Sequence, residues 1–421
     1  MADRDPSERA ARRPAAGGGD LLAEARALLP EVIELRRAIH AEPELGLDLP
    51  RTREKIEAAL AELDLELSTG GSTAQVSATL RGRSPGPTLL LRADMDALPM
   101  QEDTGLPFAS REAGRMHACG HDAHVAMLVG AARLLERRRG ELPGNVRFLF
   151  QPGEEGHGGA RILIEEGLLE RDPRPDAAFA LHVDPTLAPG TVATRPGPIL
   201  AAADVFSAEV RGRGGHASMP HHAADPIPVA AEVVLALQSL VTRRVDVFDP
   251  VVLSVTRVQA GTTYNVIPEG AQLLGTLRSV SERGRALARE GLDRVVRGVA
   301  AAHGLEGSVQ LIPGYPVTVN DDAFAAFVLD VAAELLGPRR ALTMRAPIMG
   351  AEDFSYILQR VPGAMAFLGV RPEGEGPPAP IHSNRMILDE EALAVGVAMH
   401  AAVTLRYLEA AKQGAAPGPA S

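Results

Sequence analysis

The chain has 421 residues, of which 45% are hydrophobic, so it is long enough for two domains, or for one domain with an insertion, and for a sizeable core. Its formal net charge of −11 argues against a general nucleic-acid binder, which needs a basic face, and no apolar run reaches the roughly 18 residues that would span a membrane. The single cysteine cannot form an internal disulfide, so we expect a cytoplasmic protein that binds neither nucleic acid nor membrane.

The first two-fifths of the chain show helical patterns followed by alternating strand and helix patterns. Residues 1–20 are charged and rich in Gly and Ala, which predicts a disordered leader. Apolar residues at helical spacing predict helices over 21–40, 52–64, 123–139 and 159–169. Short apolar runs bounded by Gly and Pro predict strands over 75–82, 87–96, 145–152 and 176–183. This alternation favours an α/β fold with a mostly parallel sheet flanked by helices.

The pattern changes near residue 200. Strands are predicted over 203–218, 251–261, 271–280 and 308–315, with helices over 225–241 and 282–304. These elements fit a small α+β sandwich inserted in the larger domain. We therefore predict a discontinuous catalytic domain over 21–197 and 316–412, an inserted domain over 198–315 and a frayed tail over 413–421.

The stretch MHACGHDAH, at 116–124, holds the only cysteine beside three histidines. Cys119 and His121 lie on a turn that leads into a predicted helix, and a helix N-terminus or a bound metal favours the thiolate. An ordinary buried cysteine with surface histidines is the alternative. Polar clusters that follow predicted strands add context: Asp94 with Asp96, Glu154 with Glu155, and His182 with Asp184. Ligands gather beyond the carboxyl ends of such strands, and paired carboxylates need a cation nearby.

These residues predict a hydrolytic metal centre. The ligands would be Cys119, His121, Glu155, His182 and His382. Five ligands exceed what one tetrahedral catalytic zinc takes from protein, so two divalent ions sharing the thiolate are the simpler account. Zn²⁺, Mn²⁺, Co²⁺ and Ni²⁺ all suit such a mixed S/N/O site. Glu154, next to the ligand Glu155, would then be free to act as base.

Other polar residues receive smaller roles. His40 is interpreted as a structural histidine, whereas His117, His124 and His157 flank the ligands and are candidates for supporting them. Glu352 and Asp353, on a Gly-led turn in MGAEDFSYIL, are further candidates.

The motifs LRADMDALPMQE (91–102), MHACGHDAH, FLFQPGEEGHGGA (148–160), GHASMPH (215–221) and the late IHS occur together. Over about residues 25–410 the chain resembles the hippurate hydrolase, N-acyl-amino-acid amidohydrolase and auxin-conjugate hydrolase family of metallo-aminoacylases, related to zinc peptidases. The resemblance implies a catalytic α/β domain with a binuclear metal centre and an inserted lid and dimerisation domain. It allows a homodimer or a homotetramer.

The resemblance also implies roles for single residues. Glu154 matches the general base, and Asp96 matches a carboxylate that orients a metal-facing group. His216 matches a histidine that reaches the reacting carbonyl, in some relatives across a dimer interface, and Asn265 and Arg278 suit the free carboxylate of the substrate. Distant relatives carry a histidine ligand at the position of Asp94, so contact between Asp94 and metal is left open.

The expected reaction is metal-dependent hydrolysis of an N-acyl amino acid, hippurate-like or N-acetylated, by activated water with Glu154 as base. A dipeptidase, a carboxypeptidase or an N-acetyl-diaminopimelate deacetylase on the same scaffold is the first alternative. A metal-binding protein without catalysis is another, which Glu154 argues against. A cysteine hydrolase built on Cys119 is the last, and it predicts activity that survives a chelator.

Overall fold

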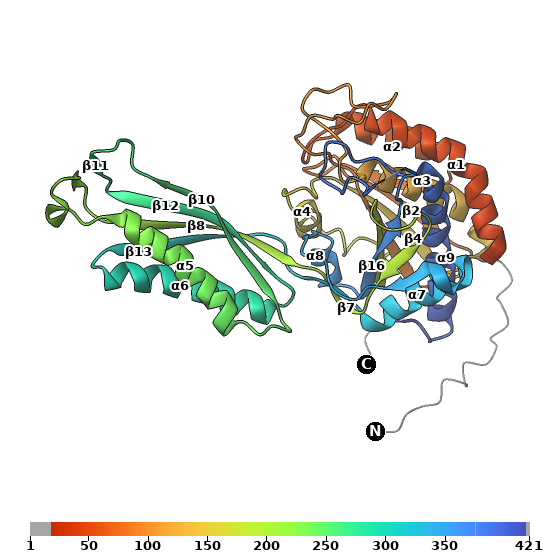
Figure 1. Cartoon of the computed structure of the whole chain (residues 1–421). Coiled ribbons are helices and arrows are strands. Elements are labelled where there is room, and N and C mark those ends of the chain that lie inside the picture. Colours follow the sequence, from red (N-terminus) through yellow and green to blue (C-terminus); the bar gives the residue numbers. More distant parts are fainter. Residues whose placement is uncertain (1–17, 375, 418–421) are drawn as a thin grey trace.

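The structure, a computed structural model, describes residues 18–374 and 376–417. It shows a larger and a smaller body joined by two adjacent linkers (Figure 1). The predicted leader falls almost entirely on residues 1–17, outside the described part, and the first helix begins at Gly18.

The larger body is built on an eight-stranded sheet in the order β1-β2-β4-β3-β5-β16-β6-β15. Its strands are β1 (Glu66–Thr69), β2 (Val76–Arg81), β3 (Thr88–Asp94), β4 (Asn145–Gln151), β5 (Ala177–Asp184), β6 (Val192–Thr194), β15 (Ala341–Thr343) and β16 (Gly363–Gly369). Its helices are α1 (Gly18–His40), α2 (Pro50–Leu60), α3 (His121–Arg137), α4 (Gly159–Glu165), α7 (Asp322–Leu336), α8 (Ser355–Leu358) and α9 (Leu393–Lys412). Short 3₁₀ helices of this body lie at Arg139–Glu141 (η2), Pro338–Arg340 (η4) and Glu390–Ala392 (η5). The short 3₁₀ helix at Pro220–His222 (η3) belongs to the smaller body.

The sheet is mostly parallel, as predicted. β3 runs parallel to both β4 and β5, and β5 runs parallel to β16, whereas β1 and β2 form an antiparallel edge. The sequence pattern extends the second helix to 64, but α2 ends at Leu60 and the exposed edge strand β1 follows. An exposed edge strand carries no apolar alternation, so the sequence gives little sign of it.

Helices cover both faces of this sheet, which explains why β3 is buried along its whole length. Side chains alternate along a strand, and Leu89 and Leu91 accordingly join one core cluster while Leu90 joins another. The first cluster lies under α1, α3, α7 and α9, and the second lies under α4 and α8. The strand ends between these layers are the place where ligand sites form in α/β folds.

The smaller body is a four-stranded antiparallel sheet in the order β10-β12-β8-β13. It comprises β8 (Ala202–Arg211), α5 (Pro226–Arg244), β10 (Val251–Ala260), β12 (Gly270–Ser279), α6 (Glu282–Ala302) and β13 (Glu306–Pro313). The helices α5 and α6 pack on one face of the sheet around a separate core. A two-residue ribbon, β9 (Gly215–His216) with β11 (Val266–Ile267), lies at the end far from the larger body (Figure 1).

The fold class is confirmed as an α/β body with a second, inserted α+β body. A short pair, β7 (Gly197–Leu200) with β14 (Thr318–Asn320), lies where the chain leaves and re-enters the larger body. The domain boundaries at 197/198 and 315/316 stay a prediction.

One helix, α5, is long and apolar enough by length and composition to cross a membrane, which a search for unbroken apolar runs does not detect. A single helix of this kind is weak evidence for a membrane span. Its buried residues, among them Val229, Val233 and Leu237, belong to the core of the smaller body. The apolar character of α5 therefore has an explanation in the packing.

Candidate metal centre

The five predicted metal ligands lie together beyond the carboxyl ends of the central strands. His182 is on β5, Glu155 follows β4, and Cys119 and His121 stand at the start of α3. His382 comes from the loop after β16. Two of the sets whose ligand atoms lie within 4.8 Å of one another consist of predicted ligands alone: Cys119, His121 and His182; and Cys119, Glu155 and His382. Cys119 belongs to both, which is compatible with the predicted shared thiolate. Further sets join His121 to Asp94 and His124, and to Glu154 and Glu155.

Cys119 is buried, with its Sγ 3.4 Å from Nε2 of His182. Burial alone would raise the pKa of the thiol, but the charges of His182 and His121 lower it to about 6. The cysteine is therefore held in surroundings that favour the thiolate, the form that binds metal.

His121 presents one ring nitrogen to this cluster. Its Nδ1 donates to the carbonyl oxygen of Asp96 at 2.8 Å, which fixes the ring. Its Nε2 is buried without a hydrogen-bond partner, 3.7 Å from Oδ2 of Asp94 and 4.0 Å from Oε1 of Glu155. A buried imidazole nitrogen without a partner is costly, and a bound cation would satisfy it.

His382 has a backbone that few residues adopt. It is the only non-glycine residue with positive φ, at 63°, in the described part of the chain. Its N–H donates to the carbonyl oxygen of Ala118 at 2.8 Å, and its Nε2 lies 3.3 Å from Oε1 of Glu155. Such strain persists only where the surroundings impose it, and it concentrates at functional sites.

The loop after β4 holds two adjacent carboxylates with different surroundings. Asp96 accepts from the N–H of Glu154 at 2.9 Å and from that of Glu155 at 3.0 Å. Both carboxylates lie near His121, but the side chain of Glu155 also faces His382, whereas that of Glu154 also lies in the buried group with Glu352. Burial, together with the charges of Glu352 and Glu155, raises the pKa of Glu154 well above its usual range. A carboxylate with raised proton affinity suits a base.

A buried network lies behind Glu154. The guanidinium of Arg92 donates to Asp94 at 2.6 Å and to Glu352 and Asp353, each at 2.9 Å. Gln151 also contacts Arg92, at 2.9 Å. Burial and the charge of Glu352 raise the pKa of Asp353 to about 7, although Arg92 opposes this shift.

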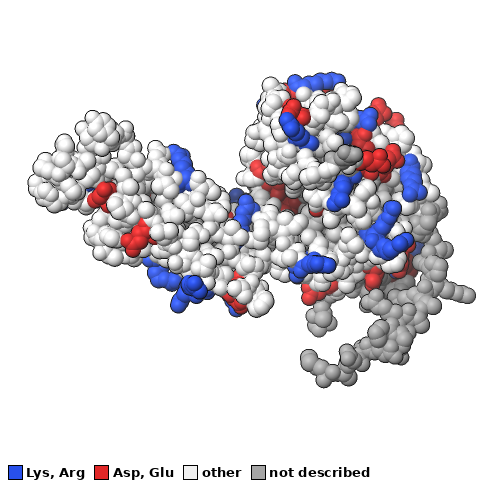
Figure 2. Space-filling view, in the orientation of Figure 1, with Lys and Arg blue, Asp and Glu red and all other residues white. Residues whose placement is uncertain are grey.

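The charge of this region favours bound cations. Arg92 is one guanidinium facing four buried carboxylates: Asp94, Glu154, Glu352 and Asp353. Figure 2 shows acidic side chains on the flank of the larger body that faces the smaller one. Buried like charges without compensation are strongly unfavourable. This surplus, together with the partnerless Nε2 of His121, fits a metal centre of the predicted kind.

Asp94 has both oxygens engaged. One contacts Nδ1 of His124 at 2.5 Å and the other accepts from Arg92. His124 in turn accepts from the N–H of Val183, beside His182, at 2.9 Å. His124 thus links two strand ends, which is the supporting contact expected of it. By contrast, both ring nitrogens of His117 are buried without a partner.

The predicted residues of the smaller body are not brought to this cluster within one chain. His216 is exposed and pairs with Val266 at the far ribbon, where its Nδ1 accepts from the Ser218 hydroxyl at 2.8 Å. Asn265, next to that ribbon, is exposed as well. Arg278 lies near the linkers, where its Nη1 is 3.4 Å from the carbonyl oxygen of Met349 and its burial lowers its pKa.

Sequence reasoning did not single out Arg92 and Tyr315. The sequence did indicate Arg92, because a charged residue inside the apolar run LLLRAD is stable only with buried partners of opposite charge. Tyr315, whose hydroxyl bonds to the main chain of Glu154, follows an ordinary Pro-Gly turn that carries no such signal.

Known proteins share this architecture. Residues 90–406 match the model of peptidase family M20/M25/M40. The N-acetylcysteine deacetylase of Bacillus subtilis is 39% identical over 92% of this chain and 99% of its own length. Thermostable carboxypeptidase 1 of Saccharolobus solfataricus is 38% identical over 89% of this chain and 95% of its own. The crystal structure of the Bacillus subtilis YXEP protein, described as a dinuclear metal-binding peptidase of the M20 family, superposes with a TM-score of 0.79 at 37% identity, covering 91% of this chain and 99% of the other.

Proposed function

The chain belongs to peptidase family M20/M25/M40, and from that premise we propose that it is a metal-dependent amidohydrolase that cleaves the amide bond of N-acyl amino acids. One observation carries the proposal. Glu154 and Glu155 are adjacent, and Asp96 fixes both of their main-chain N–H groups. Both carboxylates lie near His121, but Glu155 also groups with Cys119 and His382, whereas Glu154 groups with Glu352 and Asp353. This arrangement suits a pair of glutamates in which Glu155 binds metal and Glu154 acts as the base.

Two divalent cations would be held by Cys119, His121, Glu155, His182 and His382, with Cys119 shared. When bound, they would polarise the substrate carbonyl and acidify water. Zn²⁺, Mn²⁺, Co²⁺ and Ni²⁺ all suit the ligand set. Asp96 would orient the site by holding the ring of His121 through its carbonyl and the two glutamates through its carboxylate.

Glu154 would take the proton from the attacking water and deliver it to the nitrogen of the leaving amine. Its burial beside Glu352 supports this role, because it strengthens the affinity of Glu154 for the proton. Arg278, half-buried and without an acidic partner among the described residues, suits the free carboxylate of the amino acid. Asn265, beside the far ribbon, would join it only from a partner chain or after a movement of the smaller body. His216 would donate to the developing oxyanion, from its own or a partner chain in a dimer or tetramer.

A carboxypeptidase activity is the second candidate, since a relative with that name covers most of the chain. A peptide and an N-acyl amino acid present the same amide next to a free carboxylate, so the same residues serve both. The two activities differ only in the pocket that receives the acyl side.

The test is hydrolysis of hippurate, N-acetyl amino acids and benzyloxycarbonyl dipeptides by purified protein, before and after chelation and with added Mn²⁺ or Zn²⁺. We expect cleavage that is lost on chelation and restored by metal. Glu154→Gln should retain bound metal, measured by elemental analysis, and lose activity by 10²–10⁴-fold. Cleavage that survives both treatments would refute the metal mechanism and point to Cys119 as a nucleophile.

A further inference from the structure

Tyr315 lies in the linker that returns from the smaller body, directly after β13. Its hydroxyl donates to the carbonyl oxygen of Glu154 and accepts from the N–H of Gly158 at 3.0 Å. It therefore links the main chain at Glu154 to the main chain at Gly158, the two ends of the segment that contains Glu155. Burial and nearby carboxylates raise the pKa of this phenol above its usual value, so the hydroxyl keeps its proton.

The main chain around Tyr315 is bound to the smaller body and to the outgoing linker. The carbonyl oxygen of Tyr315 accepts from the N–H of Ala203 at 3.0 Å, which ties Tyr315 to the first residues of β8. Gly314 donates to Oδ1 of Asp204 at 3.2 Å and accepts from Arg285 at 3.0 Å. A side chain at Gly314 would meet the carbonyl oxygen of Ala203 at 2.3 Å, so only glycine permits this approach.

Asp204 is the centre of this attachment. It is buried at the base of β8, and its carboxylate accepts from two guanidiniums of α6. Arg285 contacts it at 2.7 and 3.1 Å, and Arg289 at 2.6 and 2.7 Å. Paired, fork-like contacts of this kind fix direction as well as distance. The orientation of α6 is thereby tied to Gly314 and to the residue that follows it.

We propose that Tyr315 is a positioning residue that transmits the orientation of the smaller body to the loop of the catalytic base. The proposal rests on the proposed function, because it takes Glu154 as the base. A rotation of the smaller body acts through Asp204 and Gly314 on the backbone of Tyr315, and the hydroxyl passes the displacement to Glu154 and Gly158. Closure over a substrate and placement of the base then occur together.

The first test is Tyr315→Phe, which keeps the ring and its edge contact with Tyr356 at 6.1 Å between centroids. The loss of both hydrogen bonds should lower kcat about tenfold with KM within about twofold, because the base is displaced while the substrate still binds. Metal content should stay unchanged. Hydrogen–deuterium exchange of the segment 153–160 should rise. Tyr356→Phe removes a neighbouring hydroxyl that makes no hydrogen bond in the described structure, and it should leave kcat and exchange unchanged.

The second test is a double-mutant cycle with Arg289→Gln, which weakens the attachment of α6 to Asp204 while Arg285 remains. Alone, it should raise exchange of the segment 153–160, which the substituted residue does not contact. In the Tyr315→Phe background it should add little, because the connection is already broken. Additive effects, an unchanged segment in Tyr315→Phe, or an unchanged kcat in an active enzyme would each overturn the proposal.

The exchange measurements need no substrate. If the wild-type protein cleaves none of the amides tested, the proposed function fails while the cycle of exchange rates still decides whether the connection exists. If the protein is active and the cycle is additive, the proposed function stands and Tyr315 is only a structural contact.

Discussion

The cluster at the strand ends of the larger body and the ribbon at the tip of the smaller body differ in how their polar side chains are held. In the cluster, Asp96 fixes two backbone N–H groups and the ring of His121. Most of the surrounding side chains are buried, although His382 is exposed. At the tip, His216 is exposed and its imidazole bonds only to Ser218, two residues along the chain. The larger body thus holds most residues of the candidate centre in place by itself, whereas the tip can take part in catalysis only if a movement or a second chain brings it there.

The largest effect should come from Cys119→Ala, which removes the ligand common to both halves of the cluster. We expect activity to fall by more than about 10³-fold, because the metals supply the activated water as well as the polarised carbonyl. Elemental analysis of the purified variant should show loss of metal. This separates a ligand from a nucleophile, since loss of a nucleophile leaves the metal content unchanged.

Cys119→Asp is the matched control, because it restores an anionic ligand without the thiol. It should recover part of the bound metal and part of the activity. Full metal content in Cys119→Ala, together with complete loss of activity, would contradict the role of Cys119 as a metal ligand and would point to a nucleophile.

The next effect should come from His216→Ala at the tip. If this histidine donates to the oxyanion, kcat should fall by about 10²–10³-fold, as for other donors of this kind. Metal content and melting temperature should stay at wild-type values, because the side chain is exposed and pairs with β11, which lies at the end of the smaller body far from the larger one (Figure 1).

A mixture of two variants decides whether His216 acts in the site of its own chain or in that of a partner chain. His216→Ala and Glu154→Gln should each lose most of the activity in the proposed mechanism. If the tip acts on a partner chain, co-refolded mixtures of the two variants should regain activity. In the mixed dimers, one site combines the intact His216 of one chain with the intact Glu154 of the other. A stable monomer with full activity would show instead that the smaller body closes on its own centre.

A smaller effect is expected from Asp96→Asn. The amide keeps one acceptor oxygen and loses the other, so either Glu154 or Glu155 loses its main-chain partner. Loss of such supporting contacts costs about 10–100-fold in metal affinity or activity. Titration of the metal-free protein with Zn²⁺ would measure the first, and steady-state kinetics the second.

Asp184→Asn is its control. Asp184 also ends a central strand, but its carboxylate accepts from Thr186 on the surface. It should change metal affinity and kcat by less than about twofold. Equal losses in both variants would mean that the position at a strand end, and not the contact with the glutamate loop, decides the outcome.

The two regions also differ in what the sequence allowed us to predict. The α/β fold and the inserted body follow from periodicity. Glu155 and His182 both approach Cys119, as expected of residues at strand ends that meet at one edge of a sheet. His382 was proposed as a ligand from the sequence, but its approach to Glu155 depends on a long loop and an unusual backbone that no local pattern predicts. Local pattern cannot say where His216 sits relative to the cluster, because that depends on how the two bodies are oriented. The contacts of Tyr315 depend on the same orientation.

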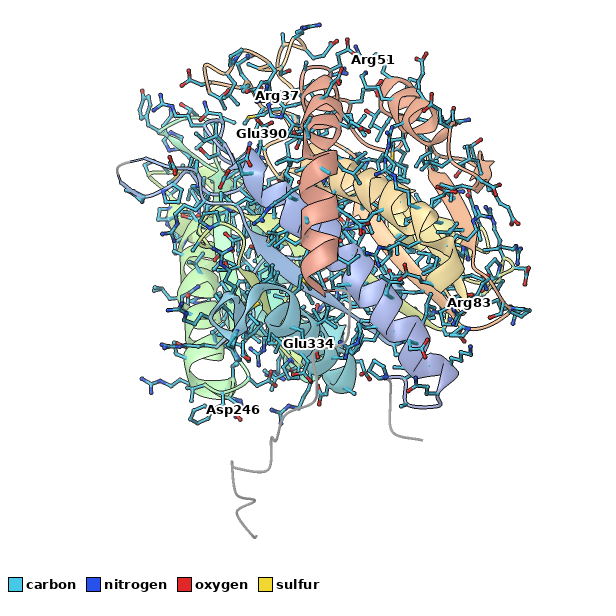
Figure 3. All side chains as sticks on the ribbon, turned by 90° about the vertical axis from the view of Figure 1, so that its right-hand side faces the viewer. Arg37, Arg51, Arg83, Asp246, Glu334 and Glu390 are labelled. Atoms are coloured by element: carbon cyan, nitrogen blue, oxygen red, sulfur yellow. The ribbon has the colours of Figure 1, made fainter. Side chains whose placement is uncertain are left out.

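The smallest effect concerns stability and lies behind the metal loop. His40, at the end of α1, has Nδ1 2.8 Å from Asp122 and Nε2 3.3 Å from Glu102. Asp122 also accepts from Arg36 at 2.9 Å, and Glu390 accepts from both Arg36 and Arg37, the latter visible beside it in Figure 3. This network joins α1 to the first turn of α3, next to His121.

Burial opposes a charge on His40, but the Asp122 carboxylate outweighs it and raises the pKa of the imidazole from 6.5 to about 9. A raised pKa in the folded state stabilises the protein fully below pH 6.5, and this contribution is lost as the pH rises through 9. The loss is at most about 3 kcal/mol. Melting curves of the metal-free protein from pH 6 to pH 10 should therefore show falling stability, and His40→Gln should flatten that fall. Parallel curves for the two proteins would mean that the network does not depend on a charged His40, and the rigidity of the larger body would then have to come from its packing alone.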